Sequence, residues 1–147
     1  MTRLALPTLA LLLALPLVSG CAVESINAPA EGSGVVAGGL ISAAVQVHVA
    51  APGASVSVQF VNAASNLFSV NTCLRRVERM VGGDWVLHPQ ELRLCDARLD
   101  VVPPQAALTT TADVPADASP GQYRFRFSMT QPAGPAVDIV TPPFLVQ

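Results

Sequence analysis

The sequence predicts an all-β domain, an antiparallel β-sandwich of about seven to eight short strands. Apolar and polar residues alternate with a period of two in several short runs, and Gly/Pro-rich turns separate these runs at regular spacing. Val, Thr, Ser, Ala, Gly and Pro dominate the chain after residue 20, whereas Lys is absent and Glu is scarce. This composition favours strands and turns over helices. At 147 residues the chain has the length of one domain.

Residues 1–20 have the pattern of a signal peptide and are not expected to belong to the domain. A basic residue, Arg3, precedes an apolar run from Leu4 to Val18. The run is interrupted by two prolines and is shorter than the roughly 20 residues that a bilayer-spanning helix needs. The pattern is therefore typical of a cleaved signal peptide and not of a retained transmembrane helix.

The apolar run ends in the four residues Val-Ser-Gly-Cys, of which the last is Cys21. This sequence resembles the lipobox of bacterial lipoproteins, which implies cleavage before Cys21 and acylation of its sulfur. Two or more acyl chains hold a protein stably on a membrane, whereas a single chain binds reversibly. Ala22 follows the cysteine. Because an Asp there tends to retain Gram-negative lipoproteins in the inner membrane, the resemblance implies the outer membrane if the host is Gram-negative. The alternative is an ordinary signal peptide followed by a chance cysteine.

Residues 21–34 are predicted to be the lipidated N-terminus and a flexible tether, and residues 35–147 the folded domain. The tether lacks apolar periodicity and ends in Gly-Ser-Gly. In the domain, the alternation of Val45, Val47 and Val49 predicts a strand that places His48 on the solvent side. Pro52-Gly53 predicts a turn. The alternating run Val56–Phe60 then predicts an antiparallel partner with one buried face.

The segment Leu67–Met80 allows two interpretations. Leu74, Val77 and Met80 have helical spacing, but β-branched residues precede them, and we favour a strand. Gly82-Gly83-Asp84 predicts a hairpin turn, after which the segment Trp85–His88 returns. Beyond Pro89, another short strand is expected at Leu92–Cys95.

The remaining runs are predicted to complete the sandwich. Strands are expected at Ala106–Val114, from Tyr123 to Ser128, at Val137–Val140 and at Phe144–Val146, with a turn at 131–135. Tyr123, Phe125 and Phe127 share one face of their strand, and Arg124 and Arg126 share the other.

Pro-Gly two residues before Tyr123 resembles the tyrosine corner of immunoglobulin-like sandwiches. Together with the strand spacing, the Gly-Asp-Trp hairpin and the closing Phe144–Val146 strand, it resembles bacterial immunoglobulin-like domains over nearly all of residues 35–147. Two features depart from antibody domains. Phe125 occupies the position of their second cysteine, and Trp85 follows a turn and need not be their core tryptophan. A jelly roll or a small barrel remains an alternative.

The cysteines separate by position. With Cys21 assigned to the lipid, Cys73 and Cys95 form an even pair in an exported protein, and the expected state is a disulfide. Closing a loop of this length should stabilise the fold by roughly 3 kcal/mol in the chain-entropy model.

Charge and motifs argue against several classes of function. The formal net charge is −2 and the pI is near 5.5, so the basic stripe of a nucleic-acid-binding protein is missing. The sequence has no Gly-x-Ser-x-Gly elbow, no phosphate-binding glycine loop and no calcium-loop spacing. The two histidines, His48 and His88, are not at metal-ligand spacing. We therefore expect no enzyme activity, no cofactor and no metal.

Arginines are the best binding candidates. Arg75, Arg76 and Arg79 lie on one predicted strand, and Arg124 and Arg126 lie on another that would neighbour it in an immunoglobulin-like sheet. Their solvent faces could form an anion-binding patch for lipopolysaccharide, peptidoglycan or an acidic partner protein. The alternative, which we favour, is a solvated face whose arginines pair with Glu78, Asp96 or Asp100.

Two functions remain. The first is a membrane-anchored lipoprotein of the bacterial cell envelope, facing the periplasm or the surface, with a non-catalytic immunoglobulin-like binding or accessory domain. The second is an inhibitor of secreted proteases that presents sandwich loops, such as the turn from Gly82 to Trp85. A domain that merely spaces or coats the surface is a third alternative.

Overall fold

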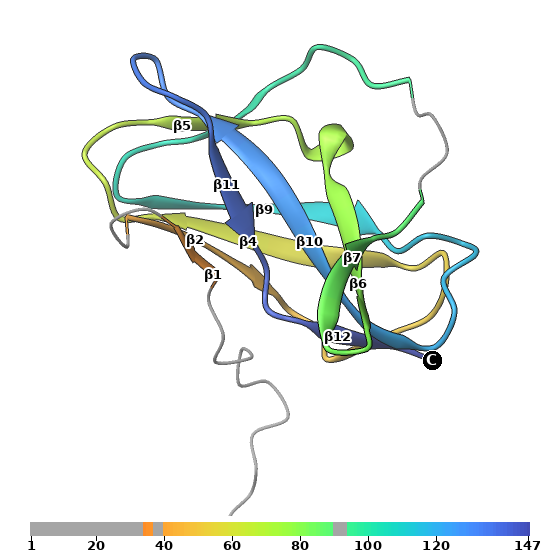
Figure 1. Cartoon of the computed structure of the whole chain (residues 1–147). Coiled ribbons are helices and arrows are strands. Elements are labelled where there is room, and N and C mark those ends of the chain that lie inside the picture. Colours follow the sequence, from red (N-terminus) through yellow and green to blue (C-terminus); the bar gives the residue numbers. More distant parts are fainter. Residues whose placement is uncertain (1–33, 37–39, 90–93) are drawn as a thin grey trace, which may run out of the picture.

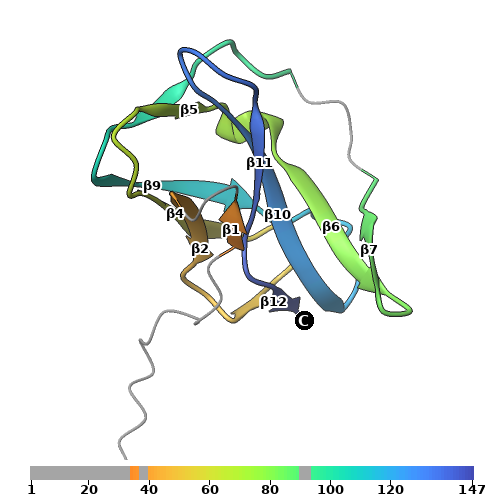
Figure 2. The ribbon, with the colours of Figure 1, turned by 60° about the vertical axis from the view of Figure 1, so that its left-hand side comes forward.

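The chain folds as two β-sheets that pack face to face (Figures 1 and 2). The computed structural model describes residues 34–36, 40–89 and 94–147. The four-stranded sheet has the order β1-β2-β4-β9. Its strands are β1 (Gly34–Val36), β2 (Ile41–Val45), β4 (Ser55–Asn62) and β9 (Ala106–Asp113). The predicted all-β sandwich is confirmed.

The eight-stranded sheet is built around β10 (Gly121–Thr130). One edge of β10 pairs with β6 and β5, and the other edge pairs with β12 and β11. The outer members are β3, which pairs with β12, β7, which pairs with β6, and β8, which pairs with β5. The bounds are β3 (Val49–Ala50), β5 (Phe68–Val70), β6 (Arg76–Val81), β7 (Asp84–Leu87), β8 (Asp100–Val102), β11 (Val137–Val140) and β12 (Phe144–Val146).

The described residues contain twelve strands, more than the seven to eight predicted, because two predicted strands are divided and because β1 and β8 were not expected. The run from Val45 to Val49 changes sheet. β2 ends at Val45 and is antiparallel to β4, whereas β3 begins at Val49 and is parallel to β12. This crossing covers an edge of the larger sheet that would otherwise be open to another chain. His48 lies in the crossing and is exposed, as expected.

The segment Leu67–Met80 is also divided. β5 and β6 are separated by a short 3-10 helix, η2 (Thr72–Leu74), and the α-helical alternative for this segment is wrong. The predicted hairpin is confirmed, with Val81 opposite Asp84 and only Gly82 and Gly83 between them. Both glycines have positive φ, 60° and 97°. A two-residue type I′ turn requires this geometry, which explains the Gly-Gly pair.

The core lies between the sheets and is centred on the inner face of β10. Tyr123, Phe125, Phe127 and Met129 are each at most 1% exposed. The ring of Phe127 meets that of Phe60, from β4 in the other sheet, edge to face at 5.0 Å. The alternation of buried and exposed residues along β10 and β4 follows the predicted period of two.

The tyrosine corner that the sequence suggests is present. The hydroxyl of Tyr123 donates a hydrogen bond of 2.9 Å to the carbonyl oxygen of Ser119, four residues upstream. Of the predicted strand Leu92–Cys95, residues 92 and 93 lie outside the described part of the chain, and Leu94 and Cys95 belong to no strand. Among the described residues, no helix is both long and apolar enough to cross a membrane.

Candidate functional site

The five arginines of the predicted patch do not share one face. Arg124 and Arg126 alternate with the buried aromatic residues of β10 and so lie on the outer face of the larger sheet. Arg76 lies directly opposite Arg126 and is exposed there. Arg79 lies opposite Tyr123 and therefore faces the core side. Arg75 precedes β6 and contacts Asp113 of the other sheet, so it does not join Arg76 in one patch.

The outer-face arginines form an ion-pair network around Glu78 of β6. The Nε atom of Arg124 lies 2.6 Å from one carboxylate oxygen of Glu78, and the Nε atom of Arg126 lies 2.7 Å from the other. Arg126 also approaches Asp138 of β11 at 3.5 Å. The guanidinium of Arg124 stacks on the ring of Trp85, 4.2 Å from its centroid. For these two arginines the structure therefore has the ion pairing with Glu78 that we favoured over an anion-binding patch.

This network sets the charge of Glu78. Burial alone would raise the pKa of Glu78, but hydrogen bonds from Arg126 and Arg124 and their positive charges outweigh it, and the pKa lies below its usual value. The hydrogen bond to Glu78 in turn raises the pKa of Arg126. An incoming anion would therefore compete with a bound carboxylate at both Nε atoms, and Arg76 is the more accessible cation of this face.

Arg75 and Arg79 have structural positions. Arg75 is 7% exposed, and its Nη2 donates to the backbone carbonyl of Asp113, on β9 of the other sheet, at 2.8 Å. Arg79 packs over the ring of Tyr123 and donates to the carbonyl of Pro120 at 3.1 Å. A Cβ on Gly121 would lie 3.2 Å from the Nε of Arg79, and Gly121 has a φ of 155°. The Pro-Gly before Tyr123 thus makes room for Arg79.

The turn considered for protease inhibition is a tight hairpin. Gly82 and Gly83 are exposed at its tip, and Trp85, on the strand that follows, packs against Arg124. Figure 1 shows this turn at the end of the sandwich that also holds the C-terminus. The inhibitor hypothesis stays a prediction.

The disulfide predicted between Cys73 and Cys95 is present, and the two Cα atoms are 5.7 Å apart. It joins η2 to the segment that leads into β8. Asn71 reinforces this connection, because its side-chain carbonyl accepts from the Cys73 N–H at 3.0 Å and its amide donates to the Asp96 carbonyl at 2.8 Å.

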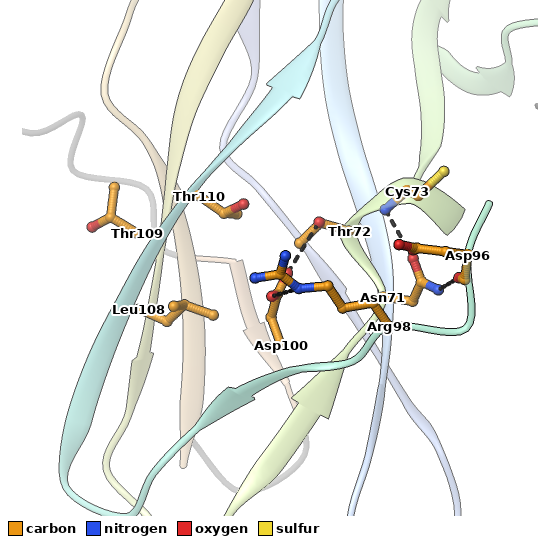
Figure 3. A pocket seen from close by; sticks show the side chains of 9 residues that line it. All are labelled: Asn71, Thr72, Cys73, Asp96, Arg98, Asp100, Leu108, Thr109 and Thr110. Carbon is orange, nitrogen blue, oxygen red and sulfur yellow. Dashed lines mark hydrogen bonds and ion pairs between the residues drawn. The ribbon is translucent and has the colours of Figure 1, made fainter.

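A polar crevice of about 380 Å³ lies beside the disulfide (Figure 3). One side is formed by Leu108, Thr109 and Thr110 of β9, and the other by η2 and the segment 96–100. Asp100 lies within it, 3.3 Å from the Thr72 hydroxyl and 3.4 Å from the Nε of Arg98. The crevice offers carboxylate and hydroxyl groups together with one exposed guanidinium, a lining suited to hydrogen bonding with a polar ligand.

A second, mostly apolar hollow of about 340 Å³ lies at the end of the sandwich where the β4–β5, β8–β9 and β10–β11 connections meet. The sequence pattern did not predict this hollow, because residues 62–66 were expected to be only a polar connection. The sequence feature that could have indicated this hollow is Asn62, a polar residue in an alternating strand at a position facing the core. Asn62 is 1% exposed and ties the loops together through its side-chain amide.

The remaining candidate residues are Cys21 and the two histidines. Cys21 lies outside the described part of the chain. Within that part, no three His, Cys, Asp or Glu side chains gather as a metal site would require. His88 is near the tyrosine corner, with its Nε2 3.1 Å from Asp117 and its ring against that of Tyr123. The hydrogen bond from His88 lowers the pKa of Asp117.

No protein-family model matches this chain, and no curated protein matches it. Solved structures similar to it include two with low sequence identity. The first is Northeast Structural Genomics Consortium target SoR45, with a TM-score of 0.44 and 13% identity over 71% of each chain. The second is a Niemann-Pick type C2 protein from the Japanese carpenter ant, with a TM-score of 0.35 and 8% identity over 67% of this chain and 79% of that one.

Proposed function

We propose that this protein is a lipid-anchored component of a bacterial cell envelope whose sandwich domain is a non-catalytic binding or accessory module. The observation that carries the proposal is the Val-Ser-Gly-Cys sequence ending at Cys21, directly after the apolar run of the signal peptide. Acylation of this cysteine would place the protein on a membrane, and its partner would be another envelope component.

The form of the domain supports this role. The first described strand, β1, begins at Gly34, the last residue of the predicted tether. A disulfide suits an exported protein, because oxidising compartments maintain it. The domain also carries the polar crevice and the apolar hollow, each of a volume typical of ligand sites, roughly 300–1,000 Å³. Both lie on a sandwich with a tightly packed aromatic core.

The test is the membrane attachment of Cys21→Ala in a bacterial host that processes lipoproteins. We expect the wild-type protein to incorporate a labelled fatty acid and to sediment with membranes, and the variant to lose both properties. Ser19→Ala is the matched control, because it keeps a small residue in the lipobox and should remain lipidated. A Cys21→Ala protein that still carries label and sediments with membranes would contradict the proposal.

Sorting gives a second, finer test. In a Gram-negative host, Ala22→Asp should move the lipidated protein from the outer to the inner membrane fraction. Separation of the two membranes on a sucrose gradient measures the shift, and Ala22→Ser serves as the control. An unchanged distribution would remove the outer-membrane assignment while leaving the lipid anchor in place.

A further inference from the structure

Two adjoining hollows form one groove across the loop end of the sandwich. The first is the apolar hollow of about 340 Å³ described above, and the second has a volume of about 330 Å³. Ser65, Asn66 and Gln131 line both, so the hollows meet at these three residues. We call this the end groove. Figure 1 shows the β10–β11 turn and the β4–β5 connection at the end of the molecule away from the C-terminus.

The end groove has an uncharged lining. None of the residues lining either hollow is Asp, Glu, Lys, Arg or His. The first hollow is walled by Leu40, Ile41, Phe68 and Val137, and the second by Leu67 together with Pro104 and Pro132. Leu40 is 47% exposed and Leu67 37% exposed. An apolar group could therefore enter each hollow from solvent and bury its surface without removing a charge from water.

Amide groups lie where the two hollows meet. Asn66 is exposed and Gln131 is half-buried, and within the described residues neither side-chain amide makes a hydrogen bond. A ligand that spans both hollows must cross these amides. An acyl chain would take them out of water without offering a hydrogen bond, which costs free energy. A peptide backbone offers both N–H and C=O groups to them. The chemistry of the groove thus favours a peptide over a lipid chain.

The walls of the end groove are held in place before any ligand binds. The buried amide of Asn62 donates to the carbonyls of Asn66, Val102 and Pro103, and its oxygen accepts from the Ala64 N–H. Gln105 adds a second tie, because its amide donates to the carbonyls of Ala63 and Ala64. Gln105 has a φ of 53°, a conformation that L-residues seldom adopt. Preorganised walls reduce the entropy that a ligand loses on binding.

We propose that the end groove binds an uncharged, extended peptide segment of a partner protein. Two apolar side chains at positions i and i+2 would enter the two hollows, because alternate side chains of an extended strand lie on the same side. Asn66 and Gln131 would hydrogen-bond the backbone between them. This inference rests on the proposed binding role of the domain and names the class of its partner.

The test is a titration of the full chain carrying Cys21→Ala with short capped peptides, followed by NMR. This background removes the anchoring cysteine, so the result does not depend on whether Cys21 is acylated. The probe is acetyl-Leu-Ala-Leu-Ala-amide, and the charged control probe is acetyl-Glu-Ala-Glu-Ala-amide. We expect saturable shifts of the side-chain amide signals of Asn66 and Gln131 with the first peptide and none with the second.

Isosteric variants locate the binding site. Asn66→Asp together with Gln131→Glu removes amide donors and adds charge, and should weaken binding of the leucine peptide at least tenfold. Gln122→Glu, at an exposed position of β10, makes the same chemical change away from the groove and should leave binding unchanged. If the double variant loses its dispersed spectrum, Gln131→Glu alone provides the comparison, with weaker binding again expected.

Three outcomes would overturn the inference. They are the absence of saturable shifts at the groove, equal binding of the leucine and glutamate peptides, and unchanged affinity in a folded groove variant. A parallel titration with 1-decanol distinguishes a peptide ligand from an acyl-chain ligand. Binding of decanol without binding of the peptide would assign the groove to an acyl chain and reject the peptide. Failure here leaves the lipid anchor of the proposed function intact, because membrane fractionation tests that anchor separately.

Discussion

The two faces of β10 are formed by alternate residues of one strand, and they are stabilised in different ways. The inner face places Tyr123, Phe125 and Phe127 in the core, where each is at most 1% exposed. The outer face places Arg124 and Arg126 around one carboxylate, Glu78, with Trp85 beside them. Apolar burial stabilises the inner face, and compensation of charge stabilises the outer face. We therefore expect substitutions on the inner face to affect folding most, and those on the outer face to act through charge.

The largest expected effect is on the inner face. Phe127→Ala removes a ring that packs against Phe60 across the sheets, and should lower the free energy of unfolding by about 3–5 kcal/mol. Denaturant unfolding followed by the fluorescence of Trp85 measures the change. Ser128→Ala, the next and exposed position of the strand, is the control and should change stability by less than about 0.5 kcal/mol. An equal loss in the free energy of unfolding for Phe127→Ala and Ser128→Ala would contradict the difference between the two faces.

Glu78→Gln should have the largest effect on the outer face. It leaves two neighbouring guanidinium groups without their shared carboxylate, and hydrogen bonds to charged groups contribute about 1.5–3 kcal/mol each, so we expect a loss of about 1–3 kcal/mol at neutral pH.

The pH dependence of stability distinguishes charge from packing at Glu78. Because the pKa of Glu78 is lower in the folded state, its contribution is fully present above its ordinary value of 4.5 and is lost as pH falls through the folded-state pKa. The difference in stability between wild type and Glu78→Gln should therefore shrink below about pH 4.5. A difference that stays constant from pH 7 to pH 3 would contradict an ionic role for Glu78.

Tyr123→Phe tests an inner-face residue whose side chain also makes a hydrogen bond. The substitution removes the hydroxyl that donates to Ser119 and keeps the ring in the core. We expect a loss of about 0.5–1.5 kcal/mol, the net contribution of one hydrogen bond. Chemical denaturation measures the loss, and an unchanged midpoint would show that the tyrosine corner adds nothing to stability here.

The smallest effect is expected at Arg76. Arg76→Gln changes an exposed side chain of the outer face and should alter stability by less than about 0.5 kcal/mol. Because Glu78 occupies the Nε atoms of Arg124 and Arg126, we also expect retention on immobilised lipopolysaccharide to stay unchanged. A clear loss of retention, with Arg98→Gln as the exposed control, would revive a smaller anion-binding patch at Arg76, Arg124 and Arg126.

Sequence patterns were reliable where a local rule governs the structure. The alternation along β4 and β10, the Gly82-Gly83 turn and the Pro-Gly before Tyr123 each depend on neighbouring residues, and each appears as expected. Errors arose where the outcome depends on distant segments. The run Val45–Val49 alternates throughout, yet it changes sheet because the free edge of β12 lies beside its second half. Nothing in the alternation itself encodes that edge.

The sequence by itself determined the all-β class and the disulfide pair, because these follow from local periodicity and cysteine number. Lipid attachment at Cys21 stays a prediction from a contiguous motif. Only the tertiary structure decided which arginines share a face, that Arg75 and Arg79 stabilise the fold, and that three loops form the end groove. The physical reason is that burial and charge compensation depend on residues far apart in the chain. The contact of Arg75 with Asp113 joins two sheets, and Asn62 reaches Val102 forty residues away.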